Sequence, residues 1–228
     1  MIDIITYVFE FILMVLSFIA SFLVFRKKDK SEVPQSNLFL SISSIFLGLY
    51  ALSTIIYSLI RQKWAIIAFL KIGMVSIVFA VFCLFLTIQI LISSSKWISI
   101  HRFYFITLLV ATTILTLLII FTDFINVIDI KTSETHFNPI IYYPFAIYVA
   151  FILIFSTFSI YYYGIRKSTG ESRKRMLLFF FGLLIMLGGL IIDAIGNTIE
   201  IEIIFDFLLF CFLSIGISFA TAAFLIKK

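Results

Sequence analysis

Seven charge-poor apolar runs divide the chain, and each is about as long as the hydrocarbon core of a membrane is thick. A helix needs roughly 20 apolar residues to cross that core. The runs are residues 4–25, 38–60, 65–92, 103–121, 142–164, 176–192 and 203–226. Both faces of each run are apolar, as in Leu177–Phe181, so the alternation of a membrane-spanning strand is lacking. We therefore predict an all-α integral membrane protein, a seven-transmembrane helix bundle that fills residues 1–228 as one domain.

The composition excludes several classes of protein. Of the 228 residues, 63% are hydrophobic and 13% are charged, whereas a soluble domain is about half apolar and a quarter charged. So few charges do not cover a surface in water, which excludes a soluble enzyme, a nucleic-acid binder and a disordered regulator. The first run carries Asp3 and Glu10 and is followed by no small-residue cleavage site, so we expect a mature helix and not a signal peptide.

Basic residues are distributed unequally between the two sides of the expected bundle. The first, third and fifth linkers and the C-terminal tail carry 13 Lys and Arg residues, and the other linkers carry 3. Cytoplasmic loops are enriched in basic residues. We therefore expect the N-terminus outside and the C-terminus in the cytoplasm of a multi-pass plasma-membrane protein. The formal net charge of +5 then reflects contact with anionic lipid headgroups, and we expect no nucleic-acid partner.

The sequence contains no pattern typical of a catalytic or metal site. Cys83 and Cys211 are expected at different depths, too far apart for a disulfide. His101 and His136 lie in linkers on opposite sides and lack metal-ligand spacing. Hydrolase nucleophile motifs and phosphate-binding glycine loops are also missing. We expect neither a cofactor nor an enzymatic activity.

Two linkers carry further information. Residues 122–141 alternate in a β-prone manner on each side of a polar tip, which fits either a short hairpin over the mouth of the bundle or an irregular loop. The fifth linker, residues 165–175, is densely basic and fits either an anchor on anionic lipid or a docking surface for a cytoplasmic partner. Its basic residues are Arg166, Lys167, Arg173, Lys174 and Arg175.

Ionisable side chains within the runs are costly in lipid and usually face the interior of a bundle. Glu10 and Lys71 are each expected about 9 Å below the outer surface, where an ion pair between them is one interpretation. Asp193 and Asn197 lie one helical turn apart near the outer end of the sixth run, and Asp206 begins the seventh. We interpret all five as a ligand-binding polar pocket open to the outside. An internal ion pair and unrelated interfacial side chains are the alternatives.

From Leu38 onward the chain resembles the N-terminal seven-transmembrane region of histidine kinases. The matching features are Lys71-Ile72-Gly73, the linker at 127–138, the basic residues 173–175 with Gly182, Gly188, Gly189 and Asp193, and Asp206 with residues 214–218. The resemblance implies a sensor module that binds a small ligand in its outer half. The chain departs from the pattern at Asp193, where the family usually has Asn, and after Ile226, where the family has an output domain. The resemblance therefore implies a signalling partner, a kinase or a cyclase, that acts in trans.

Other seven-helix classes fit the residues less well. A retinal protein needs a lysine in the middle of its last helix, and residues 203–226 contain none before the tail. The motifs of G-protein-coupled receptors are missing: residues Ser93–Lys96 stand where such a receptor has Asp-Arg-Tyr after its third helix. A small-solute transporter or channel and an accessory membrane subunit remain as alternatives, although a conduit needs polar groups at several depths. A homodimer is left open.

Overall fold

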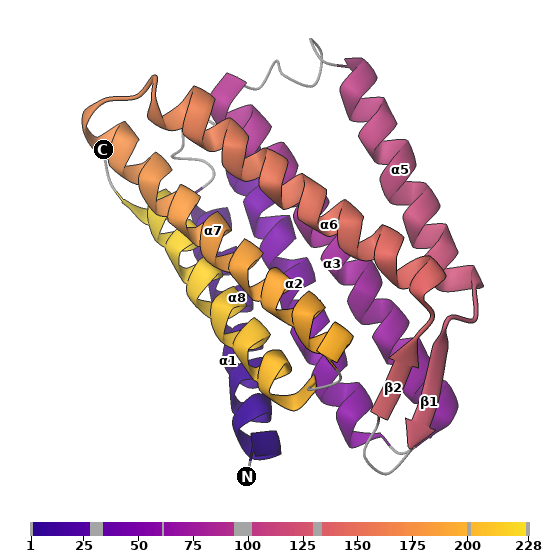
Figure 1. The fold of residues 1–228 in the computed structure, drawn as a ribbon. Helices are drawn as coiled ribbons and strands as arrows, with labels where there is room; N and C mark the ends of the chain where they lie inside the picture. Colours follow the sequence, from indigo (N-terminus) through magenta and orange to yellow (C-terminus); the bar gives the residue numbers. More distant parts are fainter. Residues whose placement is uncertain are drawn as a thin grey trace.

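The computed structural model describes the backbone of residues 2–27, 34–60, 62–93, 102–129, 134–199 and 202–226 and the side chains of 5–27, 34–60, 62–93, 102–128, 135–193 and 207–226. These segments contain seven helices long and apolar enough to cross a membrane and one two-stranded sheet (Figure 1). The elements are α1 (Ile2–Arg26), α2 (Pro34–Leu59), α3 (Lys63–Ser93), α5 (Arg102–Phe121), β1 (Ile125–Asp129), β2 (Glu134–Phe137), α6 (Pro139–Ser159), the π-helix η2 (Ile160–Ile165), α7 (Gly170–Ile199) and α8 (Glu202–Leu225). The predicted fold class is confirmed.

Six of the seven spans begin and end within a few residues of the predicted runs, and α7 is the exception. It begins at Gly170 and ends at Ile199, beyond both ends of the predicted run 176–192. Arg173, Lys174 and Arg175 therefore occupy its first turns, and the expectation that they belong to a linker is wrong. An apolar run ends where the lipid ends, whereas Lys, Arg and Glu are good helix formers that continue the helix into the headgroup layer.

The long linker between α5 and α6 is a hairpin, so the hairpin alternative is confirmed. β1 and β2 are antiparallel, with Ile125 opposite Phe137 and Val127 opposite Thr135. Ile125 is buried in an apolar cluster with residues of α3 and α5. Directly after β2, the Asn138 side chain accepts a 3.0 Å hydrogen bond from the backbone N–H of Ile140 and caps α6.

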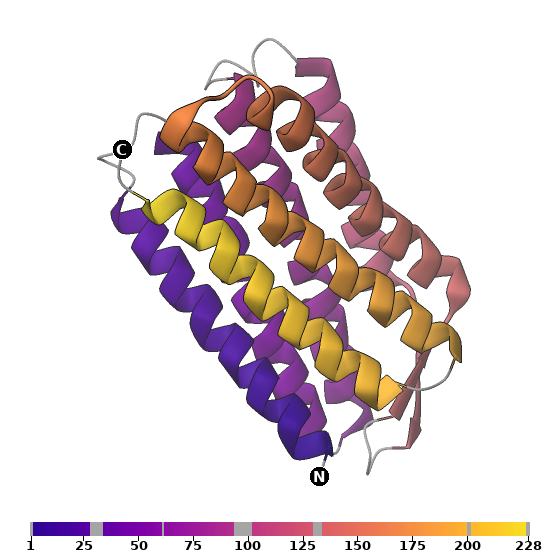
Figure 2. The same cartoon turned by 60° about the vertical axis from the view of Figure 1, so that its left-hand side comes forward.

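Six helices form a closed ring, in which α1, α2, α3, α6, α7 and α8 contact one another in that order and α8 returns to α1. Figure 2 shows α8 between α1 and α7. α5 lies outside the ring and contacts α3 and α6, and its buried residues Thr112, Leu115 and Ile119 follow helical spacing. The N-terminus and the hairpin lie at one end of the bundle and the C-terminus at the other. We call these the hairpin end and the basic end.

Small hydroxyl side chains join α1, α2 and α3. The Ser21 and Ser41 hydroxyls lie 2.8 Å apart between α1 and α2. Ser43 donates to the Ala80 carbonyl at 2.7 Å, and Ser36 donates to the Thr87 carbonyl at 3.1 Å, both from α2 to α3. Helices in lipid gain little from the hydrophobic effect and associate through close packing and such hydrogen bonds, each worth roughly 1 kcal/mol. Serines therefore hold the N-terminal half of the bundle together.

Candidate ligand-binding cavity

A cavity of about 130 Å³ lies at the hairpin end. Its described walls come from α2, α3, β2, α6, α7 and α8, so one site gathers residues from most of the chain. The polar lining residues are Tyr50, Ser53, Thr54, Tyr57, Thr135, Tyr142 and Asp193, and the apolar ones are Leu70, Gly73, Met74, Ile77, Phe137, Phe145, Leu190, Leu209 and Phe210.

Aromatic rings form much of the cavity wall. Tyr50 on α2 stacks on Phe210 of α8, with ring centroids 5.8 Å apart. Elsewhere in the lining, Phe137 of β2 stacks on Tyr142 of α6 at 5.6 Å, and the ring centroids of Tyr142 and Phe145 lie 6.4 Å apart. Thr135 and Phe137 are two residues apart on β2, so both side chains lie on the strand face directed at the cavity. The hairpin thus covers the mouth of the bundle.

Two of the hydroxyls that line the cavity are directed at their own helix. Ser53 Oγ donates to the Tyr50 carbonyl at 2.7 Å, and Thr54 Oγ1 donates to the Ala51 carbonyl at 2.7 Å. This local bonding is common for hydroxyls in helices and removes their donor from the site. Asp193 is the one acidic residue among the described residues that line the cavity, and none of those residues is basic. The described lining of the cavity is therefore acidic and aromatic.

Of the five predicted ligand-binding residues, the structure brings Asp193 to the cavity. Asn197 and Asp206 lie in α7 and α8, but their side chains fall outside the described residues. Glu10 is buried in α1, with 5% of its surface exposed. α1 contributes no described residue to the cavity wall, so Glu10 does not line it.

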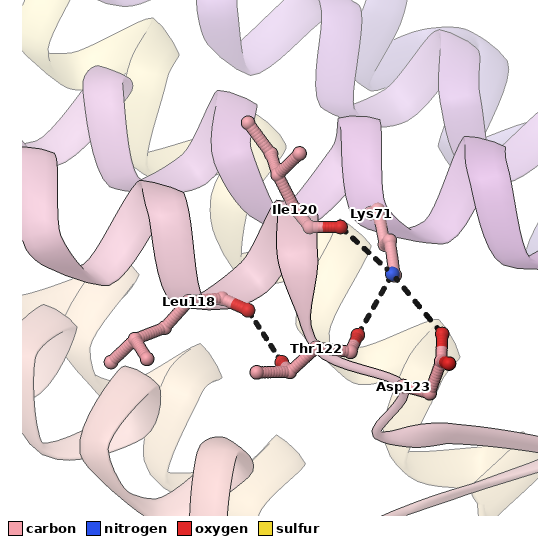
Figure 3. Close-up of polar contacts among 5 residues, drawn as sticks. All are labelled: Lys71, Leu118, Ile120, Thr122 and Asp123. Atoms are coloured by element: carbon pink, nitrogen blue, oxygen red, sulfur yellow. Dashed lines mark hydrogen bonds and ion pairs between the residues drawn. The ribbon is translucent and has the colours of Figure 1, made fainter.

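Lys71 is also outside the cavity, because its ammonium group is directed at the end of α5 (Figure 3). Lys71 Nζ donates to the carbonyl oxygens of Thr122 at 2.8 Å and Ile120 at 3.0 Å. It also lies 3.9 Å from a carboxylate oxygen of Asp123. The last carbonyls of a helix have no partner within the helix and carry partial negative charge, so they attract a cation.

The interpretation of Lys71 and Glu10 as an ion pair is therefore wrong, because the Lys71 ammonium binds the end of α5. Equal depth places two side chains at one level, but α1 and α3 lie on either side of α2 in the ring. Lys71 instead joins α3 to the start of the hairpin, and so supports the cover of the cavity from outside.

Between the cavity and the basic end, the described side chains inside the ring are mostly apolar. A second space of about 40 Å³ shares Ile77 and Leu190 with the cavity. Its other described walls are Ser43, Leu47, Ala80, Val81, Leu84, Leu153, Met186, Leu213 and Ile217. The Ser43 hydroxyl is bonded to the Ala80 carbonyl, so the described walls here offer a ligand almost no polar group.

At the basic end, the five predicted docking residues fall into two groups. Arg175 is partly buried, and its guanidinium donates to the Ile226 carbonyl at 2.6 Å. The other four, Arg166, Lys167, Arg173 and Lys174, are exposed. Arg166 lies 5.0 Å from the Tyr162 ring centroid, Lys167 lies 5.2 Å from that of Tyr163, and Lys174 pairs with Glu171 at 3.1 Å. Lys27, directly after α1, also donates to α8, to the Leu225 carbonyl at 2.5 Å. The end of α8 is therefore held by cations from both of its neighbours.

Sequence reasoning missed the tyrosines and the hairpin residues of the cavity. Tyr57 and Tyr142 lie close to helix ends at the hairpin side, whereas Tyr50 lies farther inside α2. Aromatic residues are common near such ends because they suit the membrane interface. Their position gives no signal that separates a lipid-facing ring from one in a site.

The chain matches no protein-family model, no curated protein and no solved structure. The function of the site is therefore inferred from its geometry and from the sequence.

Proposed function

We propose that this protein is a membrane-embedded sensor that binds a small ligand in the cavity and passes a signal to a separate cytoplasmic partner, such as a kinase or a cyclase. The hairpin end then faces outside and the basic end faces the cytoplasm, as the distribution of basic residues favours. The ligand enters from the extracellular side or from the outer leaflet. The resemblance to the seven-transmembrane region of histidine kinases supports the same function.

The observation that carries the proposal is the course of α7. One uninterrupted helix places Asp193 in the cavity and Arg175 at the basic end. The two residues are 18 positions apart, about 27 Å along the helix axis. A displacement of the Asp193 end therefore reaches the basic end without passing through a loop.

α8 is bound to α7 closely enough to move with it. A Cβ atom on Gly182 would lie 2.8 Å from the Gly216 carbonyl oxygen, and one on Gly189 would lie 2.8 Å from Phe212 Cβ. Such close approach of helix backbones is typical of small-residue contacts in membranes. Arg175 adds a hydrogen bond between the same two helices at the basic end. The pair α7–α8 is thus the element whose position a ligand at Asp193 biases.

Hydrogen–deuterium exchange of the purified protein in lipid nanodiscs tests this coupling without a known ligand. Asp193→Asn should change the exchange rate of backbone amides in residues 164–175 by about fivefold or more, within the range of coupling between distant sites. Lys71→Met is the matched control, since it alters the hairpin end but lies off α7. A change confined to the hairpin end in both variants would overturn the proposal.

A specific observation keeps transport as the second candidate. Four polar atoms in the ring, Gln89 Nε2 and the hydroxyls of Ser156, Ser214 and Thr221, are buried and have no hydrogen-bond partner among the described residues. Thr157 and Ser218, by contrast, donate to carbonyls of their own helices as expected. Buried polar groups along a bundle are typical of a conduit. Flux of small cations and neutral solutes into proteoliposomes decides between the two, because a sensor should give none above protein-free vesicles.

A further inference from the structure

The charge of the cavity selects the sign of its ligand. Asp193 is partly exposed and lines the cavity from α7. Lys71 lies between the lining residues Leu70 and Gly73 in the sequence of α3. Its ammonium, however, is bound at the end of α5 and not in the cavity. One carboxylate stands among the described lining residues, and none of those residues is basic, so the described lining favours a cation over an anion. The low polarity of the surrounding bundle strengthens that preference.

The aromatic lining selects an organic cation over a metal ion. Six aromatic side chains line the cavity: Tyr50, Tyr57, Phe137, Tyr142, Phe145 and Phe210. An ammonium group that carries alkyl substituents gains from contact with aromatic faces, and quaternary ammonium ions are bound by such cages. Hard metal cations instead need six or more oxygen ligands. Here one carboxylate stands beside hydroxyls of which two donate to their own helices.

The size of the cavity limits the cation further. An apolar cavity of about 150 Å³ holds a molecule of the size of benzene, and this one measures about 130 Å³. A trimethylammonium group with a short substituent is of this size. The apolar space of about 40 Å³ that shares Ile77 and Leu190 extends inward from the cavity, so it has room for a short alkyl substituent of the cation.

We infer that the cavity binds a small alkylated ammonium ion, with the cationic group beside Asp193 and its alkyl groups against the aromatic rings. This inference rests on the proposed function, since it names the class of ligand that the sensor detects. The hairpin is part of the site because Phe137 supplies one of the rings.

Isothermal titration calorimetry of the purified protein in a non-ionic detergent tests the inference with three probes of nearly equal shape. Choline carries the charge, 3,3-dimethyl-1-butanol replaces its nitrogen with carbon, and 3,3-dimethylbutanoate is an anion. Choline should bind at least about tenfold more tightly than the neutral alcohol, as expected for a cation beside aromatic faces and a carboxylate. The anion should not bind.

Variants locate the binding. Asp193→Asn should lose most of the preference for choline over the alcohol, and Phe137→Leu should weaken choline while size-exclusion profiles stay unchanged. Asp123→Asn is the matched control, because it removes an exposed acid at the same end that does not line the cavity. Equal binding of choline and the alcohol, no binding of choline, or unchanged choline binding by Asp193→Asn would each overturn the inference.

The sensor proposal fails separately from this inference. Choline binding that depends on Asp193 but leaves hydrogen exchange of residues 164–175 unchanged would support the cation site and contradict the sensor. Coupling from Asp193 to the basic end without choline binding would support the sensor and overturn the cation site.

Discussion

Ser53 and Gly73 approach so closely between α2 and α3 that a Cβ atom on Gly73 would lie 2.6 Å from Ser53 Oγ. Both residues line the cavity, so the contact that sets the helix spacing also sets the width of the site. The Ser53 hydroxyl is fixed by its hydrogen bond to the Tyr50 carbonyl, and it yields only if that bond breaks or the helices separate.

We expect Gly73→Ala to destabilise the bundle by roughly 1–3 kcal/mol, as overpacking does, and to lower the melting temperature in detergent. Ser53→Ala removes the clashing oxygen, so the double variant Gly73→Ala/Ser53→Ala should recover most of the loss. Differential scanning fluorimetry of the four proteins measures this coupling. Strictly additive effects would show that the two side chains do not share the contact.

Lys71→Met should loosen the hairpin. The carbonyls of Ile120 and Thr122 lose their shared donor, at a cost of roughly 1–2 kcal/mol. We expect faster hydrogen exchange in residues 122–129 and 134–138, with the basic end unaffected. Lys63→Met, which removes an exposed cation at the start of α3, is the control and should exchange like wild type. If both variants exchange alike, Lys71 does not hold the hairpin.

Gly182→Ala should separate α7 from α8. The added methyl group meets backbone atoms, the Gly216 carbonyl oxygen at 2.8 Å and the Ala220 nitrogen at 3.0 Å, which cannot rotate away. We expect a loss of roughly 1–3 kcal/mol, visible as a lower melting temperature. Gly188→Ala serves for comparison, since its methyl group would meet the Phe212 ring at 3.4 Å, an ordinary contact. Equal melting temperatures of the two variants would contradict the close packing.

The proposed orientation is tested by cysteine labelling in intact cells. In a background with Cys83 and Cys211 replaced by Ala, Asn126→Cys should react with a membrane-impermeant maleimide, because Asn126 is an exposed residue of β1. Thr169→Cys, exposed at the basic end just before α7, should react only after permeabilisation. The reverse pattern would invert the orientation and with it the side from which the ligand enters.

The spans were predictable because crossing a bilayer is a local property. About 20 apolar residues suffice wherever they stand in the chain, and each of the seven predicted runs overlaps one observed span. The ends of α7 were not predictable in the same way, because hydropathy marks the edge of the lipid and not the end of a hydrogen-bonded helix. Asp193 could be placed near an end of the bundle because it interrupts an apolar run.

The partners of the side chains were decided by the tertiary structure. α3 is apolar all round, so no periodicity in its sequence tells which face meets α2, which meets α5 and which is left for lipid. The sequence by itself therefore determined the class of protein, the number of spans and the depth of Asp193 and Lys71. The packing of the helices against one another decided that Lys71 binds the end of α5 and that Asp193 lines one cavity with six aromatic side chains. Rotation of each helix about its axis is fixed by its neighbours, because lipid is as apolar as the side chains that face it.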